Sequence, residues 1–261
     1  MTQSVFNGLM HQIGPSHVLG FFLVLARISP LFVVAPLFSS QMIPTQVRTV
    51  IAVALSIGMT PIAMHGQTIP SDPLIIAALF ITNALTGLGF SLAVSVVIAA
   101  VNSAGALLDV VAGFSYGQLI NPFDGSQGGV LTNLYSMIGL ALFIAIGGDA
   151  WMLRGIEHSL VLVPLTGAPK ISSLAAGIDM AAGTVFVSAL ELAAPALLAL
   201  LITDVAFGLV SRVMPQLNVF AVGFPLKIGV AMLVVAASLP FLGGFLSNQV
   251  AGVVSSALQA L

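Results

Sequence analysis

Long apolar stretches, separated by short polar or proline- and glycine-containing connections, make up nearly the whole chain. A helix that crosses a membrane needs about 20 consecutive apolar residues, and several of the stretches reach that length. The pattern therefore predicts an all-α protein of the integral-membrane type. The predicted helical stretches are residues 17–38, 49–64, 74–108, 129–148, 151–163, 171–214 and 228–261.

Prolines inside these stretches predict long helices that are bent or broken. A proline removes one backbone hydrogen bond and clashes with the preceding helical turn, so it bends or ends a helix. Pro30 predicts that the helix of the first stretch is kinked or split, and Pro195 predicts a break in the stretch 171–214. Pro240 predicts that the last stretch forms two helical pieces.

Two further stretches have a more specific pattern. Residues 74–108 carry no charge and are too long for one upright crossing, so they predict a long tilted or bent helix with Gly87 and Gly89 at the bend. Residues 151–163 predict a short amphipathic helix. Its apolar face holds Leu153, Ile156, Leu160 and Val163, and its polar face holds Arg154, Glu157 and His158.

The composition supports a membrane-type protein with one helical domain over residues 1–261. Hydrophobic residues make up 59% of the chain, charged residues make up 5%, and the mean hydropathy is +1.16. An ordinary soluble domain has roughly 25% charged residues. The formal net charge of −2 gives no support for nucleic-acid binding. The absence of cysteine excludes a disulfide framework and a thiolate metal site.

A few ionisable residues interrupt the apolar stretches. A charge at the centre of a bilayer costs about 2.5–3.5 kcal/mol on insertion scales, so each such residue needs a protein partner or a wet cavity. We expect these residues to form structural pairs with one another or with neighbouring subunits. The alternative is a substrate or proton pathway, as in a transporter. The predicted buried structural charges are Arg27, Asp109, Glu191, Asp204, Arg212 and Lys227.

The central stretch 109–129 combines glycines, acids, amides and aromatic residues between two apolar segments. Long loops without secondary structure are uncommon and usually functional, which favours a re-entrant or pore-facing loop over an ordinary external loop. Residues 113–117 match G-x-S-x-G, but an apolar helix precedes them and His158 is the one histidine downstream, so the match is interpreted as chance. The four histidines have no metal-ligand spacing, and the chain has no P-loop and no dinucleotide fingerprint in a strand–helix context, so we expect no metal and no cofactor.

Several short motifs resemble one known family in their order and spacing. They are Arg27-Ile28-Ser29-Pro30, Ala35-Pro36, Ile43-Pro44, Val47-Arg48, Gly113-Phe114-Ser115, Asn121-Pro122, Gly125-Ser126-Gln127, Gly147-Gly148-Asp149, the run Asp204 to Arg212, the run Pro215 to Phe220, and Gly223-Phe224-Pro225-Leu226-Lys227. Together they resemble flagellar biosynthetic protein FliR, the R-type subunit of the type III secretion export gate. The family often has an Asp where this chain has Asn121, and Asp124 is a candidate to supply that acid.

The resemblance implies a non-enzymatic subunit of a protein-conducting gate, at the flagellar basal body in the bacterial inner membrane or in an injectisome. It implies P-type and Q-type gate subunits, B-type and A-type export proteins, membrane lipid and unfolded flagellar export substrates as partners. The family's mid-chain loop acts as a plug, which corresponds to residues 113–129 here. The implied plug and pore-lining residues are Gly113, Phe114, Ser115, Tyr116, Gly117, Gln118, Leu119, Ile120, Asn121, Pro122, Phe123 and Asp124.

Two other functions compete with this interpretation. The first is a secondary transporter with a mid-membrane polar site for a small solute around Asp109, Glu191 and Asp204. On an ideal helix Glu191 and Asp204 lie about 220° apart, which disfavours one shared carboxylate site. The second is an intramembrane serine hydrolase that uses Ser115.

Overall fold

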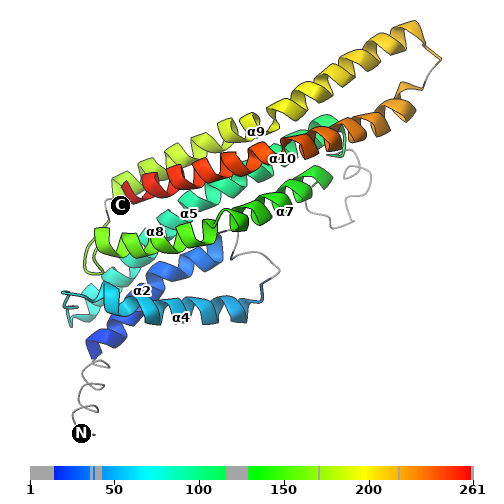
Figure 1. The fold of residues 1–261 in the computed structure, drawn as a ribbon. Helices are drawn as coiled ribbons and strands as arrows, with labels where there is room; N and C mark the ends of the chain where they lie inside the picture. Colours follow the sequence, from blue (N-terminus) through cyan, green and yellow to red (C-terminus); the bar gives the residue numbers. More distant parts are fainter. Residues whose placement is uncertain are drawn as a thin grey trace. The chain divides into compact units, whose positions relative to one another are not determined.

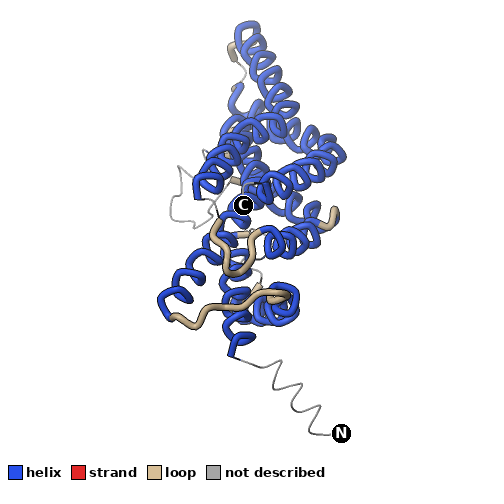
Figure 2. The backbone as a smooth tube through the Cα atoms, turned by 90° about the vertical axis from the view of Figure 1, so that its left-hand side faces the viewer, coloured by secondary structure: helices blue, strands red, loops and turns tan. Residues whose placement is uncertain are grey.

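The computed structural model describes residues 15–35, 38, 43–115, 129–169, 171–216 and 218–259. Helices joined by short loops account for these residues, and none of them forms a strand (Figure 2). The helices in Figure 1 are α2 (Pro15–Val34), α4 (Thr45–Ala63), α5 (Pro73–Ala112), α7 (Val130–Ala145), α8 (Gly148–Leu162), α9 (Ile171–Val213) and α10 (Val219–Gln259). The predicted all-α class is confirmed.

Five of the helices, α2, α4, α5, α9 and α10, include segments long and apolar enough to cross a membrane. α7 has only 16 residues, which is shorter than the spanning length predicted for residues 129–148. It meets α8 at a bend of 65°, and the two helices pass the same test only as one broken span or re-entrant pair. Gly147 lies at the bend with φ +73°, a left-handed conformation that glycine adopts readily.

The helices are more continuous than the prolines predict. Pro30, Pro195 and Pro240 each lie inside an unbroken helix, so a split at Pro30 and the predicted breaks at Pro195 and Pro240 are wrong, whereas a kink at Pro30 stays a prediction. α10 also begins nine residues before the predicted start at 228 and includes Pro225. A proline costs one hydrogen bond, whereas ending a helix in apolar surroundings would leave several backbone groups without partners. Continuing the helix is therefore the smaller penalty.

The described chain divides into two compact units. The first comprises α2, α4, α8, the N-terminal part of α5, the start of α9 and the end of α10. The second comprises the C-terminal part of α5, α7 and most of α9 and α10. α5, α9 and α10 each continue from one unit into the other. Two contact units joined by continuous helices do not decide the number of domains, so a single domain stays a prediction.

Glycines allow the helices of the first unit to approach closely. A Cβ at Gly87 on α5 would overlap the carbonyl group of Arg27 on α2. A Cβ at Gly155 on α8 would clash with the ring of Phe90 on α5. Small residues at helix crossings are typical of membrane proteins. The predicted single long helix is thus observed as α5, and Gly87 lies where α5 crosses α2; a bend at Gly87 and Gly89 stays a prediction.

The amphipathic pattern of α8 is confirmed. Ile156, Leu160 and the following Val163 are buried in the first unit together with Met152, whereas Leu153 is half-buried. The predicted polar residues Arg154, Glu157 and His158 are all exposed.

The second unit contains an antiparallel pair made by α9 and α10 (Figure 1). The Gln249 Nε2 group donates a hydrogen bond of 3.3 Å to Ser188 Oγ at one end of the pair. Nearer the turn between the helices, Lys227 forms an ion pair with Asp204. Most of this pair is not covered by the rest of the chain, because only 28% of an apolar 18-residue window of α9 and 17% of one of α10 is buried, and many exposed side chains on both helices are large and apolar.

Candidate functional site

The predicted plug loop is described only at its two ends. Gly113, Phe114 and Ser115 follow α5, and Gly129 precedes α7. The predicted plug residues Tyr116, Gly117, Gln118, Leu119, Ile120, Asn121, Pro122, Phe123 and Asp124 lie outside the described residues. The structure therefore describes the residues at the base of this loop. We define the loop base as Asp109, Phe114, Gly129, Thr132 and Lys227.

The carboxylate of Asp109 joins the two sides of the loop base. Asp109 lies in the last turn of α5 and is 2% exposed, so it is part of the helix and not of the predicted loop. Its Oδ1 accepts the backbone N–H of Leu131 at 2.9 Å. Its Oδ2 accepts the backbone N–H of Thr132 at 2.8 Å and the Thr132 hydroxyl at 2.5 Å. The side chain thus caps the N-terminus of α7 from a different helix.

This cap explains how a carboxylate can be buried among apolar helices. The first N–H groups of a helix have no partner within the helix, and its N-terminus carries a partial positive charge. The residue at the start of α7, Gly129, has no side chain to cap it. Asp109 supplies both the missing acceptor and the complementary charge. Its negative charge is therefore already satisfied by structural contacts.

Glycines make the Asp109 contact sterically possible. A Cβ at Gly129 would overlap the Asp109 carboxylate. One turn before Asp109, a Cβ at Gly105 would lie 2.7 Å from the Cα of Thr132, closer than real Cβ contacts come. Gly113 ends α5 with φ +92° and donates its N–H to the Asp109 carbonyl at 3.1 Å. The left-handed conformation of this helix-ending residue favours glycine.

The N-terminal part of α10 contacts the other side of the loop base. The Lys227 ammonium pairs with Asp204 on α9 and lies 3.4 Å from the carbonyl oxygen of Val111 in the last turn of α5. The rings of Phe114 and Phe224 pack edge to face with centroids 6.4 Å apart. A cation near the last carbonyls of a helix is favourable because that end carries partial negative charge. Lys227 therefore links α9, α10 and the end of α5.

Arg27 has a comparable structural role in the first unit. Its side chain is fully buried, and its Nη1 donates to the carbonyl oxygens of Ser159 at 2.9 Å and Val163 at 2.7 Å. These carbonyls end α8, so the cation caps a helix C-terminus. Arg27 and Asp109 are thus buried within the chain.

The remaining predicted buried charges differ in their surroundings. Asp204 and Lys227 form an ion pair with side chains that are 42% and 20% exposed. Glu191 and Arg212 are exposed, so within this chain they are not buried. Shelter for them in an assembly stays a prediction.

The competing transporter site is not assembled by the described residues. The Asp109 carboxylate caps α7, the Asp204 carboxylate pairs with Lys227, and exposed Glu191 contacts neither of them through a hydrogen bond or ion pair. No group of three His, Cys, Asp or Glu side chains in the described part of the chain could hold a metal ion. The Ser115 hydroxyl likewise has no hydrogen bond to a histidine or carboxylate there.

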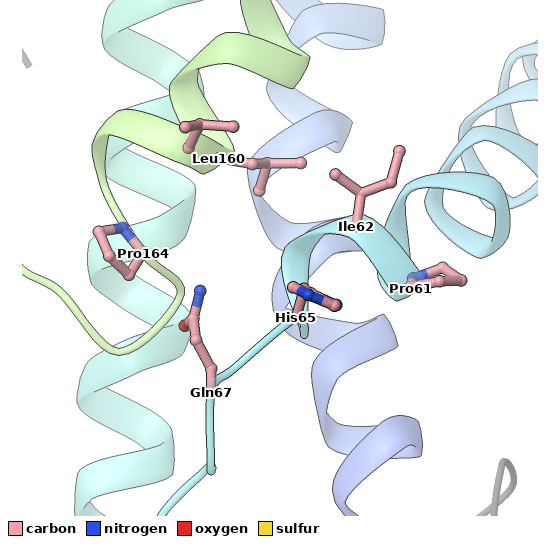
Figure 3. Close-up of a pocket in the computed structure, with 7 residues that line it drawn as sticks. Pro61, Ile62, His65, Gln67, Leu160 and Pro164 are labelled. Atoms are coloured by element: carbon pink, nitrogen blue, oxygen red, sulfur yellow. The ribbon is translucent and has the colours of Figure 1, made fainter.

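One pocket was not predicted from the sequence (Figure 3). It has a volume of about 700 Å³ and lies in the first unit, between the C-terminal ends of α4 and α8. The residues that line it are Pro61, Ile62, His65, Gln67, Leu160, Val161 and Pro164. The fully buried Asn83 was not predicted from the sequence either; its Nδ2 donates to the carbonyls of Leu79 and Leu165 at 2.8 and 2.9 Å. An asparagine within the uncharged apolar stretch 74–108, which also holds Asn102, was the available signal.

Comparison with known proteins places the chain among relatives of similar length. The sequence model of a family described as bacterial export proteins, family 1, matches residues 18–253. Flagellar biosynthetic protein FliR of Bacillus subtilis (strain 168) is 32% identical over 85% of this chain and 87% of that protein. FliR of Escherichia coli (strain K12) is 27% identical over 86% of each. Surface presentation of antigens protein SpaR of Salmonella typhimurium is 27% identical over 86% and 83%.

Proposed function

The chain belongs to the bacterial export proteins, family 1, and from that membership we propose that it is a subunit of a flagellar type III protein-export gate. In this role it forms part of the channel entrance for unfolded flagellar proteins and performs no covalent chemistry. Several of its relatives are named for flagellar biosynthesis, which favours the flagellar system over an injectisome. The proposed location is the bacterial inner membrane at the flagellar basal body.

The lengths of the helices support a place within a larger assembly. α5, α9 and α10 have 40, 43 and 41 residues. At 1.5 Å per residue each is about 60 Å long, whereas the hydrocarbon layer of a membrane is about 30 Å thick. Large parts of these apolar helices therefore need cover from other proteins. P-type and Q-type gate subunits, with B-type and A-type export proteins nearby, are the proposed partners, and lipid covers what remains.

The contact of Asp109 with α7 is the observation that carries the proposed gating mechanism. It joins the end of α5 to the start of α7 and thereby holds the two ends of segment 116–128 together. Lys227 and Phe224 hold the same end of α5 from α10. We propose that the loop of residues 113–129 closes the channel at rest with its apolar side chains. In this mechanism the loop base stays fixed, and the loop between its ends moves aside for an export substrate.

An exchange of the loop interior tests this proposal. Residues 116–128 are replaced by an equal number of glycines and serines, which leaves Asp109, Phe114 and Gly129 in place. We expect the gate to assemble normally and the cells to become permeable to small solutes, because the bulky apolar side chains of the plug are gone. Solute uptake is measured beside co-purification of the gate subunits. Normal permeability in a fully assembled variant would contradict the plug mechanism.

A further inference from the structure

The pocket in the first unit has apolar walls that are open to the outside. Figure 3 shows residues from the end of α4 on one side of it and residues from the end of α8 on the other. Ile62 on α4 is 50% exposed and Val161 on α8 is 65% exposed. Its volume of about 700 Å³ is typical of pockets that hold a ligand or a short chain segment. We name it the α4–α8 pocket, and we expect its occupant to present an apolar surface.

Gln67 adds a hydrogen-bond acceptor to the α4–α8 pocket. Its Nε2 group donates to the Ala63 carbonyl at 2.9 Å, which uses one end of the amide. Its Oε1 atom is buried and has no hydrogen-bond partner among the described residues. Buried polar side-chain atoms in native proteins nearly always have a partner. None of the lining residues is Asp, Glu, Lys or Arg, so an uncharged apolar occupant with one hydrogen-bond donor fits this pocket.

The N-terminal end of α2 lies beside the α4–α8 pocket. A Cβ at Gly20 on α2 would lie 2.5 Å from the Met64 Sδ atom, so the two residues are in contact. Met64 directly precedes the lining residue His65. α2 begins at Pro15, five positions before Gly20, which corresponds to about 8 Å along the helix axis. Residues 1–14, which lie outside the described residues, therefore join the fold close to the pocket.

The sequence of residues 1–14 has the properties that this occupant needs. It contains no Asp, Glu, Lys or Arg. On an ideal helix, four of its apolar side chains fall within an arc of about 100°, and Asn7 falls on the opposite side. Gln12 lies at the edge of the apolar arc, and its amide N–H groups are hydrogen-bond donors. The four apolar residues that share the arc are Val5, Phe6, Leu9 and Ile13.

The dipeptide Gly14-Pro15 allows the chain to turn between this segment and α2. A residue that precedes proline is disfavoured in the helical conformation, and Gly-Pro pairs are typical of turns. Pro15 is the first residue of α2, a position where proline is well tolerated. The segment is therefore able to leave the axis of α2 and turn toward the end of α4.

Other occupants and other places for the segment are less favourable. Amphipathic helices that lie on a membrane surface usually carry Lys or Arg on their polar face, and residues 1–14 have none. A lipid or a second copy of the chain would have to compete with a segment that is tethered beside the pocket. A short tether gives an effective concentration in the millimolar range. The chain's own N-terminal segment is therefore the favoured occupant.

We propose that residues 5–13 form an amphipathic helix whose apolar face fills the α4–α8 pocket of the same chain. In this arrangement the Gln12 amide donates a hydrogen bond to Gln67 Oε1. The segment then joins the start of α2 to the ends of α4 and α8. This inference concerns a contact within the chain, so it does not depend on the proposed export function.

Disulfide trapping tests the contact, since the chain has no cysteine of its own. The full chain with L9C and I62C is oxidised in isolated membranes, and the disulfide is measured by mass spectrometry. N7C with I62C is the matched control, because Asn7 is two positions from Leu9 but lies on the polar side. We expect the L9C/I62C disulfide to form about tenfold faster, because a disulfide needs two Cβ atoms that lie close and face each other. Equal rates, or disulfides only between two copies of the chain, would overturn the proposal.

Photo-crosslinking in cells identifies the occupant without any change in the pocket. The photoreactive residue p-benzoylphenylalanine replaces Leu9 in the full chain. We expect crosslinks from this position to residues 61–67 or 160–164 of the same chain. Crosslinks only to lipid or to a different polypeptide would overturn the proposal.

A change at Gln12 tests the hydrogen bond to Gln67. Q12E removes the donor and places a carboxylate opposite the Gln67 oxygen, so it should slow the L9C/I62C disulfide about fivefold. Q3E is the matched control, because it makes the same change in the same segment but farther from the apolar arc. Equal rates in the Q12E and Q3E variants would refute the proposed hydrogen bond.

Discussion

Removal of the Asp109 carboxylate tests whether this side chain stabilises the loop base. D109A deletes the acceptor of three hydrogen bonds and leaves the buried N–H of Leu131 and the half-buried N–H of Thr132 without it. An unsatisfied buried donor costs about 1–3 kcal/mol, and a charge at a helix N-terminus adds up to about 2 kcal/mol. We therefore expect D109A to destabilise the chain by about 3–6 kcal/mol, with D109N giving a smaller loss because its amide retains one acceptor.

Asp72 provides a matched control for this effect. Its Oδ1 accepts the backbone N–H of Leu74 at 2.9 Å near the start of α5, in the same kind of contact but at an exposed position. Water replaces the acceptor in D72A, so we expect a loss of about 1 kcal/mol. The two aspartates thus make similar contacts and differ in burial.

Heating of detergent extracts measures the difference between the two variants. The fraction of chain that stays soluble at each temperature is quantified by immunoblotting. At about 2–4 °C per kcal/mol for a chain of this size, D109A should lower the midpoint by about 6–24 °C, and D72A by about 3 °C. If the two variants shift the midpoint equally, the buried carboxylate is not the main cap of α7, and the fixed loop base loses its support.

Three further predictions concern other helix contacts. Arg27→Ala removes the buried cation that caps α8 and leaves its terminal carbonyls without that donor, which should cost about 1–3 kcal/mol in the same heating assay; Arg27→Lys retains the charge and should cost less. Gly105→Ala should be destabilising because the new Cβ would clash with the backbone of α7. Gly208→Ala on α9 should be neutral or slightly stabilising because no atom lies near the new Cβ. The amount of each variant that co-purifies with the other gate subunits measures both effects. A double-mutant cycle with K227M and D204N measures the coupling energy between Lys227 and Asp204. An exposed ion pair contributes up to roughly 1 kcal/mol, and we expect the coupling energy to exceed this value only in the assembled gate. An equal coupling energy in the isolated chain and in the assembled gate would contradict burial of this ion pair by partner subunits.

The proline positions illustrate what local sequence rules cannot decide. Pro195 and Pro240 predict breaks in their helices when only the helical turn that contains each proline is considered. In the structure, backbone groups that lose one partner remain inside a long helix that packs on others, and the helix continues. The local penalty is real, but it is smaller than the penalty of exposing several backbone groups to an apolar environment.

At the candidate site, too, the sequence predicts some features and the tertiary structure decides others. The sequence placed an unusual loop after residue 108 and identified Asp109 as a charge that needs a partner. It could not show that the partner is the N-terminus of α7, because the contact joins a side chain to backbone N–H groups 22 and 23 positions away. Every residue except proline has a backbone N–H, so a contact with backbone N–H groups leaves no recognisable motif in the sequence.

The amino-acid sequence by itself determined the helical class, the membrane-type surface, the approximate helix stretches and the family motifs, because each follows from hydrophobic pattern or residue order. Only the tertiary structure decided which charges are satisfied within the chain. Arg27 and Asp109 end up buried on helix termini, whereas Glu191 and Arg212 remain exposed on α9. The reason is physical: the stability of a charge in an apolar protein depends on the dipoles and groups around it, and only folding brings those together.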